Sequence, residues 1–235
     1  MASLADPLAT LKRARKDLAA LKERVETLRH TGERESVNLE PDRKISGRWH
    51  YKLPNAFKDV STDVGVIAGM LRSILDQLVF ALFELHNGHP PPAKRRTQFP
   101  ICQAPNDFCS RIKPDLEGLA VEHIVLIRQL QPYNGGHWLT RLKSLAEEHK
   151  HKKLIFLKAE GTPGGSYRAR ATDPTNLDTF HTFKSGVKAP KSMYVDSYIS
   201  GTITLADGTP IIDTLEILQA QVSSVIDSFK PLFDS

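Results

Sequence analysis

Apolar residues recur at steps of three and four positions in three long segments of the chain, residues 4–30, 64–85 and 211–233. This spacing puts the apolar side chains on one face of a helix, so we predict an amphipathic helix in each segment. The middle segment is apolar almost all round, which is typical of the most buried helix of a bundle. We expect Ser61 or Thr62 to cap this helix, and Asn87 and Gly88 to end it.

The apolar stripe of the N-terminal helix allows two arrangements. It either packs on the chain's own bundle or forms a coiled-coil seam that joins two subunits. Because the stretch is short for an independent coiled coil, we favour packing on the same chain, or in a dimer built from such bundles. The residues of the stripe are Leu4, Leu8, Leu11, Leu18, Leu21, Val25 and Leu28.

Shorter helices and an irregular connection are predicted for the middle of the chain. Residues 89–105 contain five prolines, so we expect an ordered, non-helical connection there, with residues 98–101 lying against the body. A short helix should begin at Phe108 and a second should cover residues 116–130, where Pro132 stops it. We place a turn at residues 134–136 and a further helix over residues 138–156.

The pattern changes to strands in two regions. Residues 35–53 indicate a β-hairpin, and residues 167–171 and 194–205 are rich in alternating, β-branched and aromatic residues, with a hairpin-type turn at Asp207 and Gly208. The sequence thus predicts an α+β fold, a helical bundle around a central buried helix with a small antiparallel β-sheet. Within one compact domain, we divide the chain into residues 1–34 (N-terminal amphipathic helix), 35–160 (hairpin and bundle core) and 161–235 (small sheet and C-terminal helix).

Composition restricts the class of protein. Of the 235 residues, 40% are apolar and 25% are charged, as in ordinary soluble globular domains. The N-terminal residues carry too many charges for a signal peptide, and charged residues interrupt the apolar segment 64–85, so we expect neither a leader nor a membrane span. The two cysteines, Cys102 and Cys109, lack the CxxC spacing of a redox or zinc motif. We therefore expect free thiols and a cytoplasmic location.

Arg72 and Asp76 form the most informative charged pair of the central helix. They are four positions apart, so their side chains can meet on one face as an ion pair. Because a buried charge needs a partner, one interpretation is a structural pair inside the bundle. The other is that Arg72 binds an anion or a phosphate through its planar guanidinium group. The sequence leaves both interpretations open.

Residues 142–155 place ionisable groups against an apolar helix face, where partial burial shifts pKa values. Glu148 and His151 are three positions apart and Glu147 and His151 are four apart. Either acid can therefore orient His151 as a general base, or the pairs can serve as scaffold. A Glu-x-x-His pair is also half of a dinuclear metal site, but no second pair follows, so we predict no metal and no other cofactor. The candidate catalytic residues are Arg72, Asp76, Glu148 and His151.

The basic charge of the chain indicates a polyanionic partner such as RNA. The net charge is +5 and the pI is near 9.2. Basic residues are densest near positions 12–16, 94–96 and 150–153. If these clusters converge they form a phosphate-binding surface, and otherwise they are solvated charges that support solubility. No glycine-rich phosphate loop or nucleophile motif indicates another chemistry. The candidate ligand-binding residues are Lys94, Arg95, Arg96, Lys150 and Lys152.

Four motifs follow one another in an order that resembles a known family. Residues 71–78 (LRSILDQL) resemble an LRSxLDxL helix, and residues 97–101 (TQFPI), 130–133 (LQPY) and 145–154, similar to an L…DKHRxL segment, come after it. Together they resemble a family of uncharacterised bacterial, often actinobacterial, proteins over residues 60–235. The resemblance brings no settled function. His149 and Lys152 stand where the family pattern has Asp and Arg.

The family resemblance suggests one chemistry that this chain only partly matches. Many relatives have His at the position of Gln77, which would give Arg-x4-His from Arg72, a motif similar to that of HEPN-type ribonucleases. Such enzymes are all-helical, dimeric and metal-independent. We therefore keep two hypotheses: a binding or interaction module with RNA as a candidate ligand, or an HEPN-like ribonuclease acting as a phage-defence or toxin effector. The absent imidazole at Gln77 favours the binding module.

Overall fold

The computed structural model describes residues 2–31, 33–38, 55–150, 157–160, 168–171, 192–197, 202–205 and 207–234. The chain separates into two units, each made of segments that are not consecutive. The helical unit consists of Met1–Leu21, Ser61–Phe156 and Ile211–Ser235, and the strand unit consists of Lys22–Val60 and Leu157–Pro210. The C-terminal helix thus belongs to the same unit as the central helix, whereas the sequence prediction divides the chain into consecutive segments.

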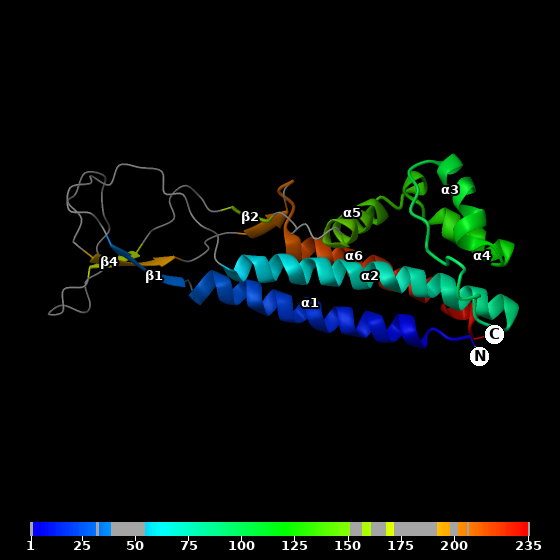
Figure 1. Cartoon of the computed structure of the whole chain (residues 1–235), viewed down its shortest axis with the longest axis horizontal. Helices are drawn as coiled ribbons and strands as arrows, with labels where there is room; N and C mark the ends of the chain where they lie inside the picture. Colours follow the sequence, from blue (N-terminus) through cyan, green and yellow to red (C-terminus); the bar gives the residue numbers. More distant parts are fainter. Residues whose placement is uncertain are drawn as a thin grey trace. The chain divides into compact units, whose positions relative to one another are not determined.

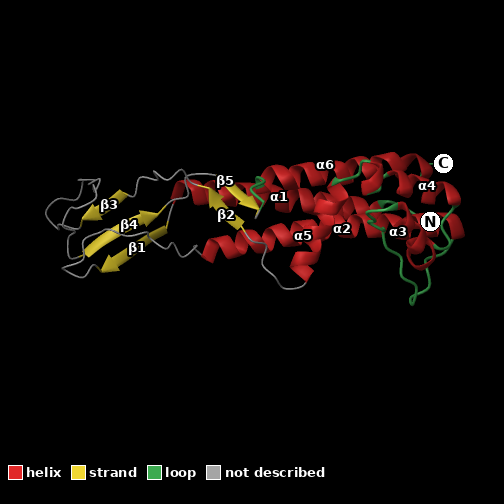
Figure 2. Cartoon of the chain, turned by 90° about the horizontal axis from the view of Figure 1, so that it is seen from above, coloured by secondary structure: helices red, strands yellow, loops and turns green. Residues whose placement is uncertain are grey.

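Three long helices dominate the helical unit. Helices α1 (Ala5–Thr31), α2 (Asn55–Asn87) and α6 (Ile211–Phe229) lie side by side, and both chain termini lie at the same end of the unit (Figures 1 and 2). Helix α1 therefore runs antiparallel to α6. The Arg15 guanidinium connects these two helices by donating a 2.9 Å hydrogen bond to the Ser223 hydroxyl. The predicted helical bundle is confirmed.

Helix α2 is the central helix of the bundle. Its apolar positions between Val60 and Phe83 are almost all buried, and Gly88 ends it in the left-handed conformation with φ 71°. Its start differs from the prediction, because the helix already begins at Asn55 and runs through Ser61 and Thr62 instead of being capped there. Val60, just before the expected cap, is fully buried, so the buried face of the helix extends beyond that cap.

The outer helices bury one face each. The stripe of α1 is buried at Leu11, Leu18, Leu21 and Val25, as expected. Leu8 was placed on the same stripe, and this is wrong, because it is one of the exposed large apolar residues. Helix α6 and a closing 3-10 turn, η3 (Lys230–Leu232), match the predicted C-terminal helix. The buried face of α6 consists of Ile211, Leu215, Leu218, Val222, Val225, Ile226 and Phe229.

Short helices cover one side of the bundle. Helix α3 (Pro105–Arg111) continues into the π-helix η1 (Ile112–Leu116), and α4 (Val121–Gln129) follows. The predicted helix over 116–130 therefore begins five residues later, because Gly118 adopts a φ of 81° that breaks the helix. A 3-10 turn, η2 (Pro132–Asn134), and Gly135 at φ 101° precede α5 (Trp138–Lys150), which packs on α6.

The strand unit contains two antiparallel pairings. Strand β4 (Ser192–Ser197) pairs with β1 (Glu33–Asn38) and with β3 (Arg168–Ala171), while β2 (Leu157–Glu160) pairs with β5 (Thr202–Leu205). In the first sheet Glu33 lies opposite Ser197 and Arg168 opposite Asp196. The second arm of the predicted 35–53 hairpin lies outside the described residues. A tight turn after β5 is found as expected, with the Gly208 amide donating to the Leu205 carbonyl.

The central helix also has the length and composition of a membrane span. Among the described residues, Asp59–Asn87 is the one stretch that meets both conditions, with a mean hydropathy of 1.7. The charged residues within segment 64–85 had led us to expect no such stretch. More than half of the stretch is buried inside the protein, and a core helix that is mostly buried passes the same test. The finding is therefore weak evidence for a membrane span.

A buried histidine in α4 should make the fold sensitive to acid. His123 is buried, and its Nδ1 has no hydrogen-bond partner within the described part of the chain. Burial, and then the nearby His86, lower the pKa of His123 below its ordinary value. As the pH falls, His123 is therefore protonated in the unfolded chain before it is protonated in the folded protein. The free energy of unfolding should thus fall as the pH drops below about 6.5.

The variant His123→Leu tests this expectation by urea unfolding at several pH values. The loss of stability below about pH 6.5 should be smaller in the variant than in the wild type, because leucine does not titrate. Equal pH dependence in the two proteins would contradict the expectation and would place the titrating group elsewhere.

Candidate functional site

Arg72 and Asp76 meet on α2 and together hold the backbone of Phe99. Arg72 Nη2 lies 3.1 Å from Asp76 Oδ1 and donates a 2.5 Å hydrogen bond to the Phe99 carbonyl. The Phe99 amide donates in turn to Asp76 Oδ1 over 2.9 Å. The pair thus binds both polar groups of one residue, and we call it the Phe99 clamp. Phe99 itself is fully buried, so the irregular residues 88–104 between α2 and α3, which we call the connecting segment, are fixed to the bundle at this point.

The Phe99 clamp is partly shielded from solvent. The side chain of Arg72 is 15% exposed and that of Asp76 is 27% exposed. Burial lowers the pKa of Arg72, and the nearby carboxylates, Asp76 first, oppose this effect. Arginine remains charged under such shifts, so Arg72 and Asp76 form a salt bridge. The same two side chains also hydrogen-bond the backbone of Phe99. These contacts support the structural interpretation of Arg72 and Asp76.

Gln131 binds the same connecting segment at a second place, next to Phe99 in the sequence. This side chain is fully buried at the end of α4. Its Oε1 accepts a 2.9 Å hydrogen bond from the Cys102 amide. Its Nε2 donates to the carbonyls of Pro100 and Ile127 over 2.9 Å and 3.1 Å. One side chain therefore satisfies three backbone groups that would otherwise lack partners.

Between these two attachments the connecting segment forms one wall of a pocket of about 320 Å³. We call it the basic pocket, because arginine and lysine are its most frequent side chains. It lies entirely within the helical unit. The residues that line it are Arg72 and Asp76 from α2, Arg96 and residues 98–101 from the connecting segment, Arg111 from α3, Asp115 from η1, and Lys143, Ala146 and Glu147 from α5.

A buried carboxylate organises the arginines of the basic pocket. Asp115 is only 3% exposed, and its Oδ1 lies 3.2 Å from Arg96 Nε, while its Oδ2 lies 3.7 Å from Arg111 Nη1. Arg96 also donates to Gln98 Oε1, over 2.9 Å from Nε and 2.7 Å from Nη2. The two guanidinium groups are thus held around one anion, yet about half of each side chain remains exposed.

Among the residues that the structure describes, the side chains lining the basic pocket carry a net charge of +1. Four basic side chains, with Lys143 4.0 Å from Glu147, face three acidic ones. Arg72 Nη1 is buried and has no hydrogen-bond partner in the described part of the protein. An unsatisfied buried donor at the wall of a positively charged pocket favours an anionic ligand over a neutral one.

The other predicted ligand-binding residues do not gather at this pocket. Lys94 is exposed on the connecting segment. Arg95 instead binds the backbone carbonyl of Glu117 and lies over the ring of Phe83, with its guanidinium carbon 4.9 Å from the ring centre. Of the cluster at positions 94–96, only Arg96 lines the pocket.

The remaining predicted residues belong to the end of α5. Glu148 and Lys150 lie in α5, but their side chains are outside the description, and His151 and Lys152 lie outside the described residues altogether. Their relation to the basic pocket therefore stays a prediction.

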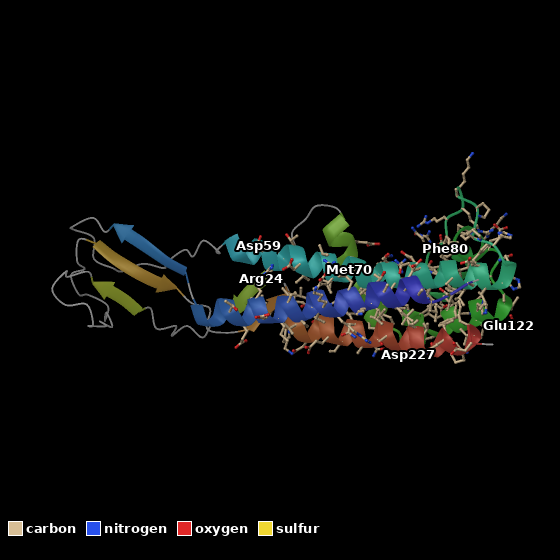
Figure 3. The ribbon with its side chains drawn as sticks, turned by 90° about the horizontal axis from the view of Figure 1, so that it is seen from below. Arg24, Asp59, Met70, Phe80, Glu122 and Asp227 are labelled. Atoms are coloured by element: carbon tan, nitrogen blue, oxygen red, sulfur yellow. The ribbon has the colours of Figure 1, made fainter. Side chains whose placement is uncertain are left out.

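Gln77 faces a different space from Arg72. It lines a groove of about 550 Å³ between the start of α1 and the end of α2, together with the acidic side chains of Asp6, Asp76 and Glu84. Phe80, labelled on α2 in Figure 3, also lines this groove. Arg72 lines the basic pocket and not this groove. The two positions of the Arg-x4-His pattern are thus not brought to one cavity.

No metal centre or activated thiol is found within the described ranges. No three His, Cys, Asp or Glu side chains described by the structure lie close enough together to hold a metal ion. Both cysteines are free, as expected, and Cys102 is buried while Cys109 is exposed. Burial raises the pKa of the Cys102 thiol, which keeps it protonated and unreactive.

Sequence reasoning missed Arg111, Asp115 and Lys143. A signal was available, because Arg111 and Asp115 are four positions apart, as Arg72 and Asp76 are, and so are Lys143 and Glu147. The spacing could not show, however, that the packing of the helices brings these pairs to one pocket. No protein-family model matches the chain, and no curated protein or solved structure is detectably similar to it. The family resemblance of the motifs stays a prediction.

Proposed function

We propose that the chain is a non-catalytic binding module whose basic pocket takes a phosphate group of single-stranded RNA. The observation that carries the proposal is the convergence of Arg96, Arg111 and Lys143 on one polar pocket. Guanidinium groups bind phosphate oxygens through paired, charge-assisted hydrogen bonds. The net charge of +5 adds a general attraction for polyanions.

The fold that accompanies this proposal is α+β, a helical bundle together with a small antiparallel sheet, and the strand pairings support it. We place the protein in the cytoplasm. A homodimer through the N-terminal helix has less support, because the stripe of α1 is already largely buried within the chain. Such a dimer would have to use exposed positions such as Leu8.

The HEPN-like ribonuclease remains the alternative function. Arg72 supports it least, because Asp76 and the Phe99 carbonyl already engage its guanidinium. Position 77 carries an amide instead of the imidazole that would act as general base. In this alternative, His151 with Glu148 would have to supply the base, and a binding module needs neither residue.

A salt titration of binding to labelled single-stranded RNA tests the proposal, with the RNA analysed on a gel afterwards. We expect binding whose logarithm falls linearly with the logarithm of the salt concentration, and RNA that stays intact. Cleavage that persists in a chelator and disappears in His151→Ala would replace the proposal by the ribonuclease alternative. Absence of binding at low salt would overturn both functions.

A further inference from the structure

Resting on the proposed function, we further propose that the basic pocket holds a single internal phosphodiester of the strand and reads neither base nor strand end. Arg96 and Arg111 bind this one phosphate together, and buried Asp115 is the positioning residue that holds them. The chemical class of ligand is thus a phosphodiester monoanion, recognised by its backbone alone.

The geometry around Asp115 supports one phosphate and not two. Arg96 and Arg111 approach the two oxygens of a single carboxylate, at 3.2 Å and 3.7 Å. Because the two guanidinium groups share the Asp115 carboxylate on their buried side, they are close enough to share one phosphate on their exposed side. Arginine presents five donors in a flat fork, so each side chain keeps donors available after its contact with Asp115.

The charge of the described lining residues matches a monoanion. Asp76 compensates Arg72, Glu147 lies beside Lys143, and Asp115 compensates one of the two remaining arginines. One positive charge is left over, and an internal phosphodiester carries one negative charge. A terminal phosphate carries about 1.5 to 2 negative charges at neutral pH, and the second charge would face Asp115 and Glu147 without compensation.

The described residues of the pocket wall offer no surface on which a base could stack. Base recognition in single strands depends on stacking against exposed aromatic side chains. Among the lining residues that the structure describes, the one aromatic side chain is Phe99, and it is fully buried. The apolar part of the lining consists of Pro100, Ile101 and Ala146, which are not aromatic. Recognition therefore rests on the phosphate, and binding should be independent of sequence.

The number of phosphates bound at the pocket can be measured from the salt dependence of the RNA affinity. Each phosphate neutralised on a single strand contributes about 0.7 to the slope of log affinity against log salt. We expect Arg96→Gln and Arg111→Gln each to weaken binding about tenfold at low salt, since each removes a charge-assisted contact. Because both contact one phosphate, the double variant should lower the slope by about 0.7 in total.

A matched control distinguishes the loss of a contact in the pocket from the loss of one positive charge elsewhere on the surface. Lys113 is exposed, lies two positions from Arg111 and does not line the pocket. Lys113→Gln changes the net charge equally and should weaken binding less than twofold. A double variant of Arg96 and Arg111 whose slope falls by about 1.4 would overturn the single phosphate, since each arginine would then contact its own. A thermal melt of each variant shows that the fold is kept.

The ligand side of the experiment distinguishes the source of the phosphate. RNA with a 5′-hydroxyl and RNA with a 5′-phosphate should bind equally, and an abasic oligomer with the same backbone should compete as well as RNA. An oligomer with an uncharged methylphosphonate backbone should not compete. Tighter binding of 5′-phosphorylated RNA by tenfold or more would overturn the internal phosphodiester, and so would failure of the abasic competitor.

Failure of this inference is distinguishable from failure of the proposed function. If wild-type protein binds RNA but Arg96→Gln, Arg111→Gln and Lys113→Gln all behave alike, the protein binds RNA elsewhere and the pocket assignment is overturned. If wild-type protein does not bind RNA at low salt, the proposed function itself is overturned.

Discussion

Replacing Gln131 by leucine should lower the free energy of unfolding by about 3 kcal/mol, because three buried hydrogen bonds disappear at once. The Cys102 amide and the carbonyls of Pro100 and Ile127 lose their partner, and the site is closed to water, since Gln131 is fully buried. Leucine has nearly the same volume, so the cavity contribution stays small. Urea unfolding followed by circular dichroism measures the difference.

Two further variants make this expectation specific. Gln103→Leu is the matched control, because Gln103 is exposed and donates a hydrogen bond to the Thr140 hydroxyl, and it should change the stability by less than about 0.5 kcal/mol. Gln131→Glu should be at least as damaging as leucine at neutral pH, since a carboxylate cannot donate to two carbonyls. Its stability relative to the wild type should improve towards about pH 4, where the acid becomes protonated. Equal effects at positions 131 and 103 would contradict the account.

Replacing Asp76 by alanine should cost about 3 kcal/mol of stability, because it breaks the Phe99 clamp. The Phe99 amide loses its acceptor, and the largely buried charge of Arg72 loses its paired carboxylate. The hydrogen bonds from Gln131 to Pro100 and Cys102 then remain, but the backbone of Phe99 loses its contact with Asp76. Thermal and urea unfolding of Asp76→Ala against wild type measure the loss.

The chain provides a control of the same geometry on its surface. Arg13 and Asp17 are also four positions apart on a helix and lie 2.9 Å from each other, but the Arg13 side chain is 69% exposed. Asp17→Ala should therefore lower the stability by no more than about 0.5 kcal/mol. If the two substitutions cost the same, burial and the contact with Phe99 would not be what makes the Phe99 clamp important.

The motifs that carry the family resemblance have a common structural role in this chain. Arg72 and Asp76 belong to the first motif, Phe99 and Pro100 to the second, and Gln131 to the third. The side chains of the first and third motifs bind the backbone of the second and of Cys102 just beyond it. These motifs thus fix the connecting segment to the bundle, and the segment in turn forms a wall of the basic pocket.

The helices could be predicted because their signals are local. Leu215, Leu218 and Val222 of α6 recur at steps of three and four and are all buried, as the pattern requires. The start of α2 at Asn55 could not be placed, since Ser61 and Thr62 offer good caps but the helix gains more by burying Val60. A local capping preference of about 1 kcal/mol is easily outweighed by such packing.

The basic pocket could be predicted only in part because its residues are far apart in the sequence. The spacing of Arg72 and Asp76 indicated an ion pair, which is found, but no pattern showed that the pair would bind the backbone of Phe99, 27 positions from Arg72. Arg96 was selected for its charged neighbours, one of which, Arg95, binds Glu117 instead. Asp115 was overlooked, since a single carboxylate among exposed charges carries no sign of burial.

The most direct test of the central claim is an NMR titration of the arginine side-chain Nε–Hε groups with single-stranded RNA. The signals of Arg96 and Arg111 should shift together, with one dissociation constant, while the signal of Arg13, which binds Asp17 on α1, should stay in place. Shifts at Arg13 that equal those at Arg96 and Arg111, or no shift at the latter two while RNA binds, would contradict the claim that the basic pocket is the phosphate site.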